Sequence, residues 1–362
     1  MAGHGDPPEG PVPDPGGGED EYRSVVFDES FIRAARLQEY SAEERMGEHA
    51  LAVRSRPGRQ PRSGSRQAVL LVLLILLAFG TAIYLGVRNP YMPPADQRAE
   101  PLRITVVPLA PEGAVPGGTP GRLLARSPAA PHRTGAGGIT FPATGRTSHF
   151  SESQVVAALS IAKDYLVASS MDPDVLGGVT VRPVRLLLDP DQLAQFDESV
   201  EASRDDGRHA VAGWLVRFDP AEVALADPST RVEGTLRFAE TNTDVLEVTA
   251  DHTFTYALRP AASGAGPTAP ASLFTVHREL RLRFDREDLR MHRAELLTSV
   301  VQAGPQACAG TDADGSLRPL LAGERAPDSG GPAVTDPYAT GRPAVSSLCG
   351  ALDPKAQPAL EP

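Results

Sequence analysis

The sequence lacks the short motifs that mark the common enzyme families. It contains no Gly-x-Ser-x-Gly elbow, no His-Glu-x-x-His pair and no phosphate-binding loop. The stretch 135–138 (GAGG) is glycine-rich, but no clear strand precedes it and no helix opens after it, so it does not predict a nucleotide site. We therefore expect no catalytic residue, no metal ligand and no cofactor, and a protein that is not an enzyme.

Positive charge is also scarce. The chain has 35 Lys and Arg residues against 46 Asp and Glu residues, a net charge of -11. A nucleic-acid-binding protein needs a basic face to release counterions, so we expect no nucleic-acid partner. Only two of the cations are lysines, Lys163 and Lys355. Glycine and proline, 34 and 35 residues, are unevenly placed, which indicates that part of the chain is linker.

One long apolar run is present, residues 68–87 (AVLLVLLILLAFGTAIYLGV), and it contains no charge. At about 1.5 Å per residue, a helix of this length spans roughly the 30 Å hydrocarbon core of a bilayer. Five arginines precede the run at positions 54, 56, 59, 62 and 66, and fewer follow it. The positive-inside rule then predicts a single-pass protein of the cell membrane, with the N-terminus cytoplasmic and the C-terminal domain extracytoplasmic.

The tail before this run divides into two parts. Residues 1–22 are rich in Pro, Gly and acid, which predicts disorder, and residues 23–67 predict a cytoplasmic helical tail with helices near 29–39 and 42–53. Helices this short are marginal alone in water, so the tail either docks on a partner or on the inner leaflet, or it stays partly helical and solvated. The tail has no cysteine, which disfavours a zinc-binding anti-sigma domain. The candidate docking residues are Phe27, Phe31, Ile32, Leu37 and Tyr40.

Residues 88–150 predict a Pro/Gly-rich linker in which only 103–107 (RITVV) resembles a strand. Residues 151–304 predict an α+β domain. Ser151 and Gln154 have capping-box spacing, and apolar residues follow at helical spacing to about 171. A second helix is expected at 190–203, and strands are expected at 181–188, 210–218, 231–241, 246–258, 273–285 and 291–303. Strict alternation predicts a curled antiparallel sheet with one buried and one wet face, and with the main helix packed on it.

His252 alternates onto the apolar face of its predicted strand, where it is either a base in a cavity or a histidine of the core. The candidate pocket residues are His252, Trp214 and Tyr256. His277 and His292 fall on neighbouring predicted strands, where they either approach one another or lie on a solvated face. This order of elements resembles the cone-shaped cystatin-like and nuclear-transport-factor-like folds.

Residues 305–362 predict a Pro/Gly-rich tail that contains both cysteines, Cys308 and Cys349. In an oxidising compartment an even count indicates a disulfide, and two free thiols are the alternative. The stretch 311–316 (TDADGS) resembles part of a calcium loop, but it lacks the further carboxylates, and a polar turn is the simpler interpretation.

Two segments, VVFDESFIRAARLQEYSAEER and RELRLRFDREDLR, resemble uncharacterised single-pass membrane proteins of actinobacteria. The order of tail, span and α+β domain also resembles assembly components of type IV secretion and conjugation machines. These resemblances imply an assembly, scaffold or binding protein of the cell envelope. The alternatives are a membrane-anchored sensor or regulator whose outer domain binds a ligand and, less favoured, an envelope enzyme. The expected partners are the lipid bilayer and a protein bound by the tail; self-association stays open.

Overall fold

The computed structural model describes residues 64–88, 99–261, 269–308, 315–327, 331, 333–339 and 349–359. The chain divides into two units, Met1–Met92 and Pro93–Pro362, which are described separately. The tail predictions for residues 1–22 and 23–63, including the five candidate docking residues Phe27 to Tyr40, lie outside the described residues, as does most of the 311–316 stretch.

In the first unit, one helix, α3 (Gly64–Arg88), contains the apolar run that we predicted as a single helix. Its side chains are described over 69–81, where the large apolar residues are about half exposed or more. Among the described residues, no helix meets the length and apolarity that a membrane crossing requires.

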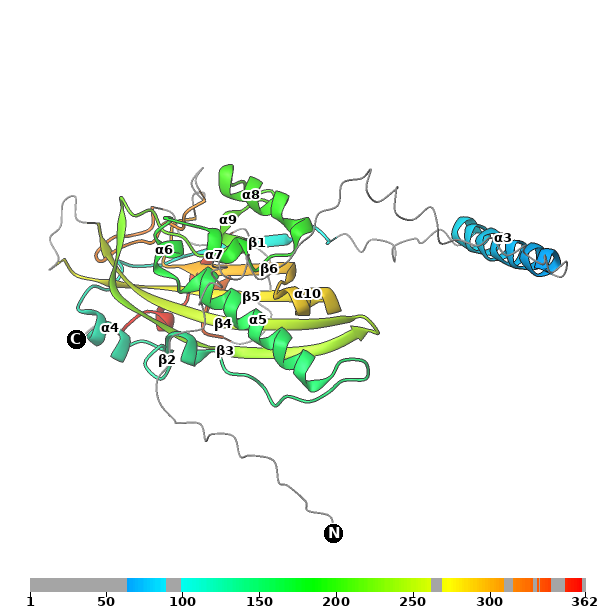
Figure 1. Ribbon diagram of the computed structural model, residues 1–362. Helices are drawn as coiled ribbons and strands as arrows, with labels where there is room; N and C mark the ends of the chain where they lie inside the picture. The colour runs from blue at the N-terminus through cyan, green and yellow to red at the C-terminus, as the bar shows by residue number, and fades with distance from the viewer. Residues whose placement is uncertain are drawn as a thin grey trace, which may run out of the picture. The chain divides into compact units, whose positions relative to one another are not determined.

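The second unit is built on a mixed sheet of eight strands in the order β2-β3-β4-β5-β6-β1-β8-β7 (Figure 1). Three long strands form its centre: β3 (Val223–Asn242), β4 (Val245–Pro260) and β5 (Ser272–Phe284). They pair antiparallel with each other and with β6 (Glu295–Gly304). The predicted meander is confirmed, because short connections leave consecutive strands side by side.

The prediction of a wholly antiparallel sheet is wrong at one end. Strand β1 (Arg103–Ala110) lies parallel to β6 and also parallel to β8 (Gly350–Leu352). The described residues 99–150 of the predicted linker are therefore part of the second unit, in which Ile104, Val106 and Leu109 are buried. The strand-like run 103–107 that we noted is part of β1, but the surrounding proline and glycine led us to assign it to a linker instead of the sheet.

The main helix, α5 (Glu152–Ser170), has the start that we predicted. Ser151 Oγ accepts from the Gln154 amide, and Gln154 Oε1 accepts from the Ser151 amide at 2.9 Å, which completes a capping box. The predicted apolar face is buried from Val155 to Leu166, and it packs against β4 and β3 (Figure 1). The main helix on a sheet, and thus the α+β class, is confirmed.

Two predicted strands are wrong. Residues 181–188 contain the short helix α7 (Arg182–Arg185), where Pro183 occupies an early helical position. Residues 210–218 contain α9 (Val211–Trp214). Every residue from Ala210 to Val216 is buried, so the alternating apolar residues there did not mark one face of a strand. The predicted helix at 190–203 is present as η2 (Pro190–Gln192) and α8 (Leu193–Glu201).

The remaining described elements are short. They are α4 (Pro120–Ala125), β2 (Arg133–Thr134), η1 (Gly135–Gly138), α6 (Pro173–Leu176), α10 (Arg286–Met291), β7 (Val334–Thr335) and η3 (Pro354–Ala356). Helix α10 occupies the start of the predicted strand 291–303, because Asp285 caps it through the Glu287 and Asp288 amides.

The sheet face opposite α5 is not wet throughout, which corrects a further expectation. Thr253, Thr255, Thr275 and His277 point to this face and are buried. Residues 333–339, here called the strap, cover them: Pro337 and Tyr338 of the strap bond to these side chains. Alternation of apolar and polar residues therefore predicted correctly which side chains lie on each face of the sheet, but it did not predict that the strap covers the polar face.

Candidate functional site

The three residues of the predicted pocket are all sealed in the core on the α5 side of the sheet. Trp214 and His252 have no exposed surface and Tyr256 is 1% exposed. Trp214 Nε1 donates to Ser199 Oγ at 3.1 Å, and the Tyr256 hydroxyl donates to the Ser170 carbonyl at 2.6 Å. These bonds fix the structure, because buried polar groups need partners, and they leave no open pocket around the trio.

Trp214 and Tyr256 meet at a residue that we did not single out, Arg278 of β5. Its guanidinium is fully buried, and Nη2 donates at 3.0 Å to the carbonyls of Gly213 and Trp214. Nη1 donates to Ser169 Oγ and Ser170 Oγ at 2.8 and 2.7 Å. Burial lowers the pKa of Arg278, yet a guanidinium stays charged in proteins.

The sequence held a signal for this cluster. Arg278 lies between Val276 and Leu280 on the apolar face of its strand. An arginine at such a position must find several acceptors, because an unpaired buried charge is costly. The acceptors come from the ends of α5 and α9, where the negative end of the α5 dipole also favours a cation.

His252 differs from this cluster, because neither ring nitrogen has a hydrogen-bond partner among the described residues. Its ring lies over Gly234 of β3, where an added Cβ would come 2.5 Å from His252 Cγ. Burial lowers the pKa of His252 to about 4, and the charge of His277 acts in the same direction. The imidazole is therefore neutral at pH 7, and no carboxylate bonds to it to form a catalytic pair.

The opposite face contains a line of polar groups under the strap. His277 Nε2 lies 3.3 Å from Asp251 Oδ1, and His277 Nδ1 lies 3.1 Å from Thr253 Oγ1. Hydroxyl, imidazole and carboxylate in this order resemble the groups that activate a nucleophile. Here the Thr253 hydroxyl is buried and donates to the Pro337 carbonyl at 2.8 Å. With the strap in place, the Thr253 hydroxyl is therefore engaged in holding it.

His292 does not approach His277, which corrects one of the two options. His292 ends α10 in the left-handed region, with φ at 58°, and its Nε2 lies 2.9 Å from Asp164 Oδ2. His277 lies on the strap side of β5 and is buried, so the solvated-face option is also wrong for it.

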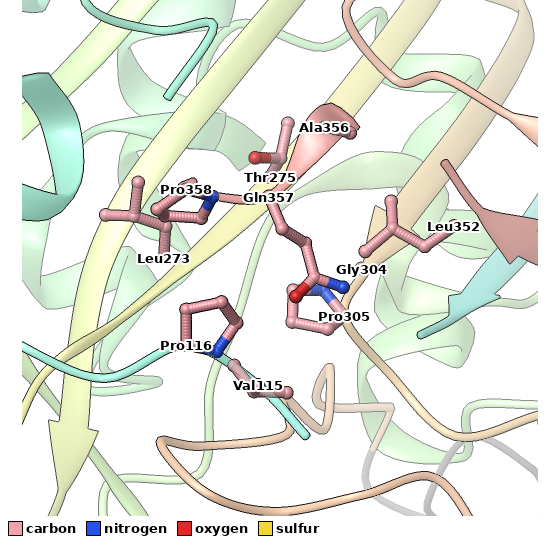
Figure 2. Close-up of a pocket in the computed structure, with 10 residues that line it drawn as sticks. All are labelled: Val115, Pro116, Leu273, Thr275, Gly304, Pro305, Leu352, Ala356, Gln357 and Pro358. Carbon is pink, nitrogen blue, oxygen red and sulfur yellow. The ribbon is translucent and has the colours of Figure 1, made fainter. Parts of the chain in front are cut away.

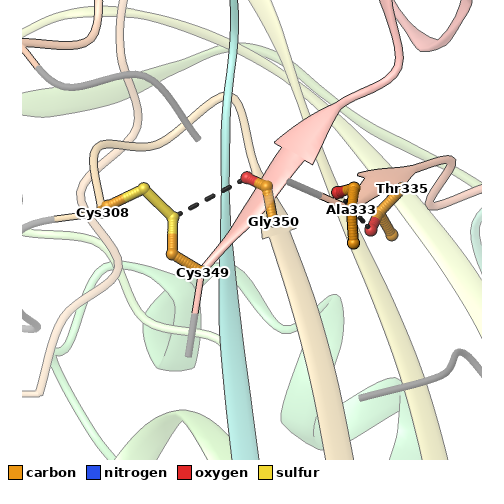
Figure 3. The surroundings of a disulfide bond; sticks show 5 residues. All are labelled: Cys308, Ala333, Thr335, Cys349 and Gly350. Atoms are coloured by element: carbon orange, nitrogen blue, oxygen red, sulfur yellow. Dashed lines mark hydrogen bonds between the residues drawn. A yellow bond between two sulfur atoms is a disulfide. The ribbon is translucent and has the colours of Figure 1, made fainter. Parts of the chain in front are cut away.

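The predicted disulfide is confirmed. Cys308 and Cys349 are bonded, with Cα atoms 5.5 Å apart and a sequence separation of 41 (Figure 3). Cys349 directly precedes β8, whose Ala351 amide donates to Ala333 of the strap at 3.0 Å. The bond thus joins the segment after β6 to the strand that pairs with the strap.

Two open hollows of the domain lie around Pro116 and Pro358, and we call them together the Pro116 groove. The larger hollow has a volume of about 510 Å³, and a neighbouring one has about 230 Å³. A small enclosed cavity lies beside them, with Pro116 and Pro358 across from the side chain of Gln357 (Figure 2). The larger hollow is lined by Glu112, Gly113, Ala114, Pro116, Leu352, Pro354, Gln357, Pro358 and Ala359. Another hollow, of about 200 Å³, lies near α10 among Asp189, Asp285 and Asp288.

The chemistry of the Pro116 groove favours binding over catalysis. The larger hollow offers apolar rings, backbone and the Gln357 amide, and Glu112 is its only titratable side chain, while Arg122 and Arg126 line the smaller hollow. General acid–base catalysis needs a positioned group with a suitable pKa. No described residue in the larger hollow pairs a nucleophile with a base.

A third region collects carboxylates near α10. Burial raises the pKa of Asp288 to about 7, and nearby Asp189 and Asp285 reinforce the shift. Burial likewise raises the pKa of Glu295 to about 7, although Arg283 bonds to it at 2.6 Å. Among the described residues, no group of His, Cys, Asp and Glu side chains is arranged to hold a metal ion. These carboxyls make stability depend on pH.

No family model, no curated protein and no solved structure matches this chain.

Proposed function

We propose that the chain is a single-pass membrane protein whose second unit serves assembly, scaffolding or binding at the cell envelope. Support for the anchor comes from the uncharged run 68–87 and from the arginines that precede it. Support for binding comes from one observation: two adjoining open hollows, the larger of about 510 Å³, form the Pro116 groove, while His252, Trp214 and Tyr256 are sealed in the core.

The groove fits part of an extended protein segment. Grooves lined by apolar side chains and a few polar groups bind partners by shape, and the polar groups set their orientation. Leu352, Pro354 and Pro358 offer the apolar surface, and the Gln357 amide offers both a donor and acceptors. We place the partner-binding surface of the second unit here, and a second docking element in the cytoplasmic tail.

A block at the groove tests this proposal. Gly113 is exposed, and a Cβ added there meets no atom within 4 Å, so Gly113→Trp fills the rim of the larger hollow without a clash. Gly145→Trp is the matched control, because Gly145 also has open space and lies outside the groove. The tail is tested by deletion of residues 22–53.

The readout is affinity capture of the full chain from solubilised membranes. We expect a defined set of proteins that loses members with Gly113→Trp or with the tail deletion, and that Gly145→Trp leaves intact. Capture that is identical for all variants, or that yields no defined partner, contradicts the proposal.

A sensor is the second candidate function. The larger hollow, at about 510 Å³, is within the size of small-molecule pockets, roughly 300–1,000 Å³. A small ligand would raise the melting temperature of the purified chain and lose this effect with Gly113→Trp. A ligand effect without captured proteins would favour the sensor.

A further inference from the structure

The strap places the Tyr338 ring against the sheet face opposite α5. The Tyr338 hydroxyl lies 2.8 Å from Thr275 Oγ1 and 3.2 Å from Thr255 Oγ1. The His132 ring meets the Tyr338 ring edge to face, with centroids 5.6 Å apart. We call the space formed by Thr255, Thr275 and His132 the tyrosine slot. Its two hydroxyls at the base and its aromatic wall suit a phenol.

The backbone next to the ring is also held. Thr253 Oγ1 donates to the Pro337 carbonyl at 2.8 Å, and Pro337 is buried. Further along, β7 pairs with β8 over only two residues, Val334 with Ala351 and Thr335 with Leu352. The strap is thus seated as an extended peptide would be, with short main-chain pairing and one deeply placed side chain.

The strap leaves polar atoms of the slot unsatisfied. His132 Nδ1 and Arg231 Nε are buried without a hydrogen-bond partner among the described residues. Arg231 pairs with Thr255 across β3 and β4, and its Nη1 donates to the His132 carbonyl at 3.1 Å, so both atoms belong to the slot. Unsatisfied buried polar atoms are rare in folded proteins, because each costs free energy.

The strap is held at its first residues by main-chain bonds and is exposed elsewhere. The amides of Ala351 and Asp353 donate to the carbonyls of Ala333 and Thr335 at 3.0 and 2.9 Å. Val334 is 63% exposed, and Asp336 and Ala339 are exposed as well. A competing segment would therefore have to replace the pairing with β8 as well as the contacts of Pro337 and Tyr338.

We propose that the tyrosine slot is a binding site for a tyrosine on an extended Pro-Tyr segment of a partner protein, and that Tyr338 occupies it as an intramolecular ligand. This goes beyond the proposed function, which places partner binding at the Pro116 groove. In the slot, Thr255 and Thr275 hydrogen-bond to the phenol hydroxyl, and Thr253 donates to the carbonyl of the preceding residue.

The first test empties the slot in the full chain with Tyr338→Ala and offers p-cresol, a tyrosine side chain without its backbone. p-Cresol should raise the melting temperature of Tyr338→Ala and leave the native chain unchanged, and toluene should raise it less. Adding Thr255→Val and Thr275→Val to Tyr338→Ala should abolish the advantage of p-cresol. Equal effects of p-cresol and toluene would overturn hydroxyl recognition.

The second test uses a labelled peptide with the strap sequence AVTDPYA and the full-length Tyr338→Ala chain, followed by fluorescence anisotropy. The peptide should bind, and AVTDPFA should bind about tenfold more weakly or worse, since the contacts of the hydroxyl with Thr275 and Thr255 are lost. Equal binding of the two peptides, or no binding, overturns the proposal. If Tyr338→Ala does not fold alone, AVTDPYA must restore its circular dichroism spectrum, and failure to do so has the same meaning.

The two proposals fail separately. Gly113→Trp should leave peptide binding to the slot unchanged, because Gly113 lies at the groove and not at the slot. Loss of captured partners with Gly113→Trp, together with no peptide binding, would retain the groove and remove the slot.

Discussion

Arg278 Nη1 donates to Ser170 Oγ at 2.7 Å, and this bond joins the central strand β5 to the last residue of α5. The same guanidinium reaches the end of α9 through Gly213 and Trp214. Two helix ends are therefore held on the sheet by one planar group with a fixed fork of donors.

Replacement of this group by lysine should be strongly destabilising. A single ammonium cannot span the serine hydroxyls and the carbonyls together, so Arg278→Lys should lower the free energy of unfolding by about 3 kcal/mol. Urea unfolding measures it. Arg281→Lys on the same strand is the control, because Arg281 is partly exposed in its pair with Glu247, and it should change stability by less than about 1 kcal/mol. Similar losses for both variants would show that Arg278 has no special role.

His252 should make the domain sensitive to acid. Its pKa is about 4 in the folded chain and 6.5 in the unfolded chain, so the unfolded chain binds more protons between these two pH values. Stability attributable to His252 is complete above pH 6.5 and is lost as the pH falls. By this shift, His252 alone lowers the free energy of unfolding by about 2 kcal/mol from pH 7.5 to pH 5, against the opposite contribution of the buried carboxyls. His252→Leu should remove that loss in urea titrations at both pH values; an unchanged slope with pH would contradict it.

Asp288 should act with the opposite sign. Its pKa is about 7 when folded, against 3.8 as the reference, so the folded chain holds the extra proton between these values. Its contribution to stability is complete below pH 4 and is lost as the pH rises through 7. Asp288→Asn keeps an acceptor for the Asp285 amide, a bond of 3.1 Å, and should raise the free energy of unfolding at pH 8 by about 2 kcal/mol. Lower stability at pH 8 would show that the Asp288 charge is favourable.

Removal of the disulfide should loosen the C-terminal part of the domain. For a sequence separation of 41, loop-closure entropy gives about 4 kcal/mol in the chain-entropy model. The pair Cys308→Ala and Cys349→Ala should lower stability by about that amount, and a reductant should destabilise only the native chain. Hydrogen exchange over residues 333–339 should rise in the same variant. Unchanged exchange there would mean that the strap is held without the bond.

How far the sequence predicts this fold depends on how each element is buried. The α5 cap at Ser151 and the alternation of β4 and β5 were predicted, because one face of each element meets the core. Helix α9 was not, because it is buried all round and loses the periodic signal. Strand β1 was noted only as a strand-like run, 103–107, within a predicted linker, and its place in the sheet was not predicted. The strap could not be predicted, since Tyr338 meets Thr275 across 63 residues of chain.

The candidate site shows the same limit. Trp214 and Tyr256 were chosen for their place on apolar stretches, and the structure does bring them together, but at Arg278 and not at His252. A polar residue on the apolar face of a strand, as Arg278 is, was therefore informative, although it marked a cluster with a structural role. The Pro116 groove joins segments near residues 112–118 and 352–359, and no local pattern links parts of the chain so far apart.

The anchor and its orientation are tested most directly by the two lysines. Lys355 lies on the exposed part of η3, whereas Lys163 is engaged with the Ile139 carbonyl at 3.0 Å. Intact cells that make the chain are treated with a membrane-impermeant amine reagent, and modified lysines are located by mass spectrometry. A reporter for the tail is added with Gln38→Lys. We predict that Lys355 is modified in intact cells and that the added tail lysine is modified only after lysis. Modification of the tail lysine in intact cells, or protection of Lys355 until lysis, would contradict an anchored protein with its folded domain outside.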